Sequence, residues 1–247
     1  MEDPAIRTAS RLLLLTAAAV LSACAAQAPP PAAVPVLAAD TPAGVPQWWI
    51  VRVRMGWQDG EQVAWHLDAL LAEQVFAPLI QRLGPALTLW RFHRRAAADD
   101  TGHQLRFQVY ADAAVAARVN AAVRASALLD ALIRAGHVRE VLIPAAPEGD
   151  SVGAISDPAW PQAVQRSWPH FAMGVSRNWL SLIGEVSAQL GPPPRDDLAA
   201  LLEHYRAVNT QVDALWQAHA QHAWLHHLNA LFGYRPLLMQ ERRLMRF

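Results

Sequence analysis

Apolar and polar side chains alternate over residues 48–55, where the sequence is WWIVRVRM. The apolar side chains fall on one side and Arg52 and Arg54 on the other, which is the two-residue period of a half-buried strand. The same period predicts a hairpin from LTLWRFHRR and HQLRFQVY, residues 87–95 and 103–110, which are separated by a turn-rich loop. A closing strand is predicted from VREVLI, residues 138–143.

Two helices are predicted between these strands. Apolar side chains recur at helical spacing over residues 61–83, where Pro78 is expected to kink the last turns and Gly84 to end the helix. Asp112 can cap a second helix that runs to about residue 135. The order strand, helix, strand, strand, helix, strand indicates an α+β fold with a ferredoxin-like βαββαβ sheet layer.

Residues 146–247 are predicted to form a helical C-terminal region packed on the sheet part, residues 47–145. Helical spacing covers residues 160–190 and 196–232, which are separated by the breaker GPPPRDD. In the second segment, a rotation of about 100° per residue gathers one stripe that begins apolar and ends polar. We expect its apolar part to pack in the core and its polar part to line a cavity. The stripe comprises His204, Val208, Val212, Leu215, His219, His222, His226 and Asn229, and His227 lies beside it.

The N-terminal segment is typical of a bacterial lipoprotein signal peptide. Arginines precede a short apolar run, and small residues precede Cys24, the single cysteine of the chain. The alternative is a buried apolar helix with an incidental cysteine. We expect residues 1–23 to be the signal peptide, Cys24 to be lipidated, and the Ala/Pro-rich residues 24–46 to form an extended tether. Ala25 after the cysteine favours an outer-membrane lipoprotein with its body in the periplasm.

Acidic and basic residues number 21 each among 247 residues, and every basic residue is an arginine. This balance gives no electrostatic reason to expect nucleic-acid binding. An apolar content of 53% supports a globular body.

The histidines of the last helix allow three interpretations. His222 and His226 are four residues apart, so both rings can reach one zinc ion, with His219 as a third ligand. No helix-borne glutamate of the HExxH type accompanies them. They can instead be structural histidines, or part of a surface that lines a substrate and handles protons. We assign no metal site and no cofactor.

Two arginines of the predicted hairpin are candidate ligand-binding residues. Arg94 and Arg106 stand in its two strands, where a guanidinium group can hold a carboxylate through two hydrogen bonds. The alternative is a solvated sheet face. The sequence has no serine nucleophile elbow, P-loop or dinucleotide-binding glycine motif.

Three short motifs, in this order, resemble those of the C-terminal domain of lanthipeptide dehydratases and the related thiopeptide-type bacteriocin biosynthesis proteins. They are WRFHRR at residues 90–95, GHQLRF at 102–107 and HHLNALFG at 226–233. The sequence departs from the family pattern at Arg95, Gln104 and Ala230.

The resemblance implies chemistry on a ribosomally made peptide, either elimination of glutamate from glutamylated Ser or Thr or formation of a pyridine ring. By position, Arg94 and Arg106 would hold the departing carboxylate, and His226 or His227 would handle the proton. His219, His222 and Asn229 would then line the ligand. Elimination requires a base and a group that stabilises enolate-like charge, and histidine with arginine can supply both.

Because the peptides of that family are cytoplasmic whereas the N-terminal segment predicts export, binding is our first hypothesis. We expect a membrane-anchored lipoprotein whose body binds a peptide or carboxylate ligand in one cavity shared by the hairpin arginines and the last helix. The first alternative is an active lyase or cyclase, and the second is a structural envelope lipoprotein without a ligand. Whether the protein is an enzyme stays open.

Overall fold

The computed structural model describes residues 44–57 and 61–234. The signal peptide, Cys24 and the tether up to residue 43 lie outside the described residues, so the predictions for them stay predictions. No helix in the described ranges is both long and apolar enough to cross a membrane.

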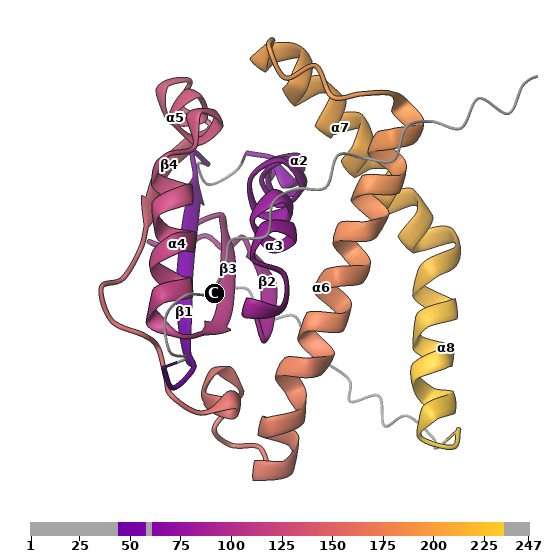
Figure 1. The fold of residues 1–247 in the computed structure, drawn as a ribbon. Coiled ribbons are helices and arrows are strands. Elements are labelled where there is room, and N and C mark those ends of the chain that lie inside the picture. The colour runs from indigo at the N-terminus through magenta and orange to yellow at the C-terminus, as the bar shows by residue number, and fades with distance from the viewer. Residues whose placement is uncertain (1–43, 58–60, 235–247) are drawn as a thin grey trace, which may run out of the picture. The chain divides into compact units, whose positions relative to one another are not determined.

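Four strands form a single antiparallel sheet (Figure 1). They are β1 (Gln47–Met55), β2 (Leu89–Arg95), β3 (Gln104–Ala111) and β4 (Val138–Leu142). Their order across the sheet is β2-β3-β1-β4, so the first strand lies in the interior between the third and the fourth. The prediction of a mixed α+β fold is confirmed.

The connection from β1 to β2 is helical but irregular. It consists of α2 (Trp65–Leu71), the π-helical turn η1 (Ala72–Phe76), α3 (Ala77–Leu83) and the short 3-10 turn η2 (Gly84–Ala86). Pro78 lies in the first turn of α3, where its missing N–H disturbs the hydrogen-bond ladder just after the π turn. Gly84 ends the helix at a φ of 47°, a conformation that favours glycine.

Two helices, not one, connect β3 to β4. They are α4 (Ala113–Arg124) and α5 (Ala127–Arg134). The predicted cap of α4 is present, since the Asp112 carboxylate accepts from the backbone N–H of Val115 at 2.7 Å. The single helix predicted up to residue 135 is wrong, because the Ser126 hydroxyl accepts from the Leu129 N–H and starts a new helix.

The main core lies on one face of the sheet. Val53, Leu105 and Phe107 of the central strands are at most 1% exposed and pack with apolar side chains of α2 to α5. Ile183 of α6 and Val208 of α7 belong to the same core and are fully buried. One continuous apolar cluster therefore unites the helices with this face of the sheet.

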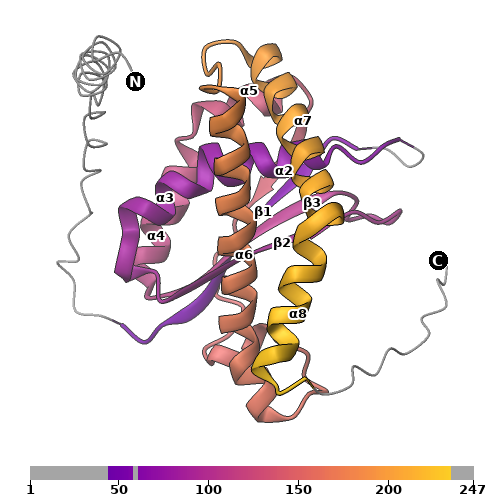
Figure 2. The ribbon, with the colours of Figure 1, turned by 90° about the vertical axis from the view of Figure 1, so that its right-hand side faces the viewer.

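The chain ends in a series of helices. After the 3-10 turn η3 (Val152–Ile155) come α6 (Gln162–Leu190), α7 (Leu198–Leu215), the π-helical turn η4 (Trp216–Ala220) and α8 (Gln221–Leu231). Helix α6 crosses β2 at a large angle, and α7 packs against α2 and α6 (Figure 2). The Ser176 hydroxyl of α6 accepts from the Phe92 N–H at 3.0 Å, so the helix supplies a partner to the free edge of this strand.

Candidate functional site

The face of the sheet opposite the main core carries a concentration of arginines, which we call the arginine face. Alternation along the strands and the antiparallel register bring these residues together. In the central row, Arg106 of β3 lies opposite His93 of β2 and Arg52 of β1. The next row aligns Arg95, Gln104 and Arg54. The arginine face consists of Arg52, Arg54, Arg91, His93, Arg95, Gln104, Arg106 and Gln108.

Three of these arginines are paired with carboxylates. Arg54 donates to Glu140 at 2.7 Å, and Arg52 donates to Glu148. Arg95 forms two hydrogen bonds with Asp99 of the hairpin loop, and this contact holds the pKa of Asp99 well below its usual range. Their positive charges are therefore locally balanced.

Arg91 and Arg106 instead have neutral partners. The Nε of Arg91 donates to the Gln108 side-chain oxygen at 2.6 Å. The Gln104 amide, turned with its oxygen toward Arg106, accepts from the Nε and Nη2 of that arginine. Within the described ranges neither arginine forms an ion pair with a carboxylate. Both guanidinium groups thus remain able to pair directly with an added carboxylate.

Burial and neighbouring charge shape the electrostatics at the centre of this face. Partial burial, followed by neighbouring arginines, lowers the pKa of Arg91 and of Arg106, and the Glu148 carboxylate opposes this shift at both groups. His93 lies two residues from Arg91 on β2 and opposite Arg106 on β3. Burial, and then the charges of Arg91 and Arg106, lower its pKa below the ordinary value of 6.5. This shift favours the neutral form of the ring, which can accept a hydrogen bond.

The chemistry that suits this arrangement is recognition of an anion with a planar pair of oxygens. A carboxylate matches the fork of a guanidinium group and makes two charge-assisted hydrogen bonds with it. Partial removal from water strengthens such bonds. Arg106 and Arg91 can provide this contact without breaking an existing ion pair.

Arg94, the other hairpin arginine, lies on the opposite face of the sheet. Its Nε donates to Asp68 Oδ2 at 2.9 Å and its Nη2 to the Trp65 carbonyl at 3.1 Å. The guanidinium carbon is 4.7 Å from the ring centroid of Trp65 and 4.9 Å from that of Trp179. The structure does not bring Arg94 and Arg106 together, so the prediction of one cavity that uses both is wrong.

Asp68 is the centre of a buried polar network that sequence reasoning missed. Its side chain is fully buried and also lies 3.1 Å from the Nε2 of His103, which is itself 1% exposed. The His103 ring packs edge-on against Trp65 at 5.0 Å between centroids. The sequence signal was available: Asp68 interrupts the apolar run LDALLA inside a predicted amphipathic helix.

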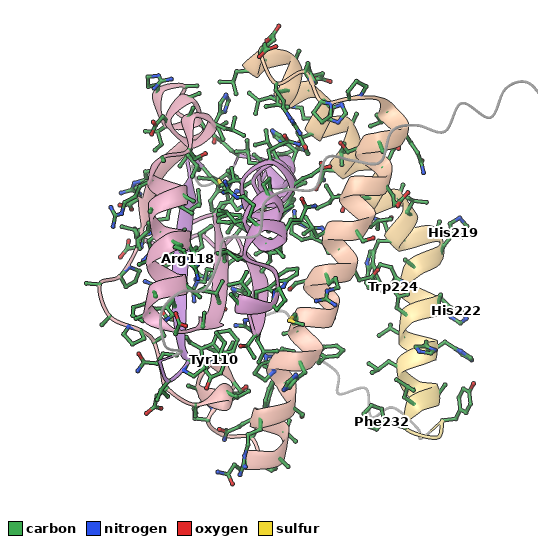
Figure 3. The ribbon with its side chains drawn as sticks, viewed as in Figure 1. Tyr110, Arg118, His219, His222, Trp224 and Phe232 are labelled. Atoms are coloured by element: carbon green, nitrogen blue, oxygen red, sulfur yellow. The ribbon has the colours of Figure 1, made fainter. Side chains whose placement is uncertain are left out.

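The histidine-rich helix lies apart from this network and from the arginine face. No residue of α8 is buried, and its histidines His222, His226 and His227 are exposed, as is His219 of η4. Figure 3 shows His219 and His222 pointing away from α6, whereas Trp224 and Phe232 point toward it. His222 stacks on His226 at 5.9 Å between centroids, and Asn229 is half-buried. The expectation that this end of the stripe lines a cavity is wrong for the described residues.

The described residues contain no cluster of three or more histidine, cysteine or acidic side chains with the arrangement of a metal site. The chain was compared with models of protein families, with curated proteins and with solved structures. No family model, curated protein or solved structure matches it.

Proposed function

We propose that the protein is an outer-membrane lipoprotein, anchored through Cys24, whose body binds a carboxylate-bearing ligand on the arginine face. The observation that carries this proposal is the pair Arg106 and Arg91, whose guanidinium groups are held in place by glutamine side chains and form no direct ion pair with a carboxylate of the described residues. A peptide with an acidic side chain is the ligand of this class that we favour. Of the site residues predicted from the sequence, only Arg106 is part of the binding site proposed here.

We also propose that the sheet layer is ferredoxin-like. The order β2-β3-β1-β4, with helical connections after β1 and after β3, supports this assignment. Because a fold of this kind hosts many activities, the assignment adds no weight to a particular function.

A lyase acting on a modified peptide is the second candidate, in line with the resemblance to lanthipeptide dehydratase C-terminal domains. The observation that favours it is the position of His93 directly across from Arg106, since a base beside a carboxylate-holding arginine is what elimination requires. Incubation with a glutamylated peptide decides between the candidates. Release of free glutamate together with a dehydrated peptide would show catalysis, and an unchanged peptide would support binding alone.

Replacing Arg106 by glutamine is expected to weaken ligand binding by roughly 10- to 100-fold. A hydrogen bond to a charged group contributes about 1.5–3 kcal/mol, and each 1.4 kcal/mol is a factor of ten. The measurement is fluorescence anisotropy with the full chain in detergent and a labelled, capped alanine peptide that contains one glutamate. The matched control is Arg124→Gln on the exposed part of α4, which should bind like the wild type. Equal affinity of Arg106→Gln and wild type would contradict the proposed site.

Replacing Cys24 by alanine is expected to leave an unlipidated precursor. One acyl chain holds a protein on a membrane only marginally, whereas several hold it firmly, so the triacylated wild type should remain with membranes through washing. Intact mass and membrane fractionation measure both effects. A wild-type protein without acyl groups and found in the soluble fraction would refute the anchoring.

A further inference from the structure

The loop after β4 carries a fixed carboxylate onto the arginine face. The Glu148 N–H donates to the Trp48 carbonyl at 2.7 Å, and the Trp48 N–H donates to the Gly149 carbonyl at 2.8 Å. This pair of bonds attaches the loop to β1 as a one-residue antiparallel bridge. Two side chains of the sheet bind the loop further on, since the Trp48 indole donates to the Val152 carbonyl and the Tyr110 hydroxyl to the Asp150 carbonyl.

Gly149 is required for this close attachment. A Cβ atom at residue 149 would lie 2.4 Å from the Cβ of Ala154, which is a steric overlap. The neighbouring Trp48 is 1% exposed and contacts Tyr110 at 5.2 Å between ring centroids. The position of Glu148 is therefore set by its own backbone bond to Trp48 and by the packed and hydrogen-bonded residues that follow it in the loop.

The Glu148 carboxylate contacts two members of the arginine face. Its Oε1 accepts from Arg52, and its Oε2 accepts from the Gln108 amide at 3.4 Å. Gln108 is also the partner of Arg91. Glu148 thus lies near the two arginines that form no direct ion pair, and it occupies the position where a second ligand carboxylate would meet Arg52.

We propose that Glu148 is a specificity-determining residue that restricts the arginine face to ligands with a single carboxylate. This inference rests on the proposed function. One ligand carboxylate is held by Arg106 and Arg91, and a second acidic group directed toward Arg52 meets the negative charge of Glu148 instead. Like charges brought together at a binding surface are strongly unfavourable, so the exclusion acts by repulsion as well as by occupancy.

Two capped, labelled alanine peptides test this inference on the full chain in detergent. One contains a single glutamate, and the other contains glutamates two positions apart, which fall on the same side of an extended peptide. The wild type is expected to bind the first at least as tightly as the second. Glu148→Gln is expected to raise the affinity for the second peptide about tenfold or more, and to change the affinity for the first much less.

Glu148→Asp keeps the charge and should keep the wild-type preference, which separates a charge effect from a disturbed loop. If the ratio of the two peptide affinities is the same in Glu148→Gln as in the wild type, this inference is overturned. The proposed function still stands in that case if binding of the single-glutamate peptide depends on Arg106. A wild type that already prefers the second peptide would overturn it as well. Absence of binding to either peptide, in the wild type and in Arg106→Gln alike, would instead refute the proposed function and this inference with it.

Discussion

Replacement of Asp68 by alanine is expected to destabilise the protein by about 3 kcal/mol, near the lower end of the range for a buried ion pair that loses one partner, because Asp68 is fully buried whereas the Arg94 side chain is 26% exposed. The Asp68 side chain is fully buried and bonds to Arg94 and His103. Without it, the Arg94 guanidinium stays between Trp65 and Trp179 with only the Trp65 carbonyl as a hydrogen-bond partner. A loss of this size is a large fraction of the 5–15 kcal/mol that typically stabilises a domain.

Denaturant unfolding of the full chain in detergent measures this loss, and Asp100→Ala is the matched control. Asp100 lies in the hairpin loop and is exposed, so its replacement should change the free energy of unfolding by no more than about 0.5 kcal/mol. If Asp68→Ala unfolds at the same denaturant concentration as Asp100→Ala, the network contributes no net stability. Arg94 would then be free for a role other than holding this carboxylate.

The two hairpin arginines show how far a strand pattern predicts a site. Alternation alone places Arg94 on the same side as Trp90 and Phe92, which is the apolar side of that strand. It cannot place Arg106 relative to Arg94, because that depends on the register of the hairpin, and a slip of one residue exchanges the two faces. In the structure Arg94 pairs with Leu105, so Arg106 lies on the other face.

The helices show a similar limit. Period and capping residues located α2, α3 and α4, and Asp112 was identified as a cap. A serine such as Ser126 is compatible with either a helix interior or a new cap, so the break before α5 depends on how each helix packs against the sheet. The π turn η1 cannot be predicted from the spacing of apolar residues either. A π turn holds one more residue than an α-helical turn, and this shifts the positions of later apolar side chains by less than one turn of the helix.

The period of the last helices predicts the histidine stripe but not its surroundings. Val208 and Val212 are buried because α6 and the sheet part cover that portion of α7. The π turn η4 follows Leu215, and no residue of α8 beyond it is buried. Periodicity specifies which side chains share a side of a helix, whereas burial depends on where the neighbouring elements end.

The second large effect concerns Tyr205, whose hydroxyl joins two helices in the interior. Tyr205 of α7 is fully buried, and its hydroxyl donates to Glu73 Oε2 at 2.5 Å and accepts from Gln74 at 2.5 Å. Both partners belong to η1, so the π turn provides the site that receives this hydroxyl. Replacement by phenylalanine leaves both groups without this partner and should cost about 1–3 kcal/mol at pH 7.

The same hydroxyl is expected to make the protein sensitive to alkali. Burial, followed by the hydrogen bond to Glu73 and its negative charge, raises the pKa of Tyr205 well above its ordinary value of 10.0. The folded state therefore keeps this proton when the unfolded state loses it. The stabilisation is fully present below pH 10 and is lost as the pH rises above 10, at about 1.4 kcal/mol per pH unit.

Tyr205→Phe should therefore be less stable than the wild type at pH 7 but lose less stability between pH 9 and pH 11. At pH 11 the wild type should have lost roughly 1.4 kcal/mol through this group alone, so the two unfolding curves should approach each other. Tyr234→Phe is the control, because Tyr234 is 61% exposed and its replacement should leave the wild-type pH profile in place. If the free energy of unfolding of Tyr205→Phe and of the wild type varies with pH in the same way, Tyr205 ionises alike in the folded and unfolded chains. That result would refute the buried, hydrogen-bonded environment of its hydroxyl.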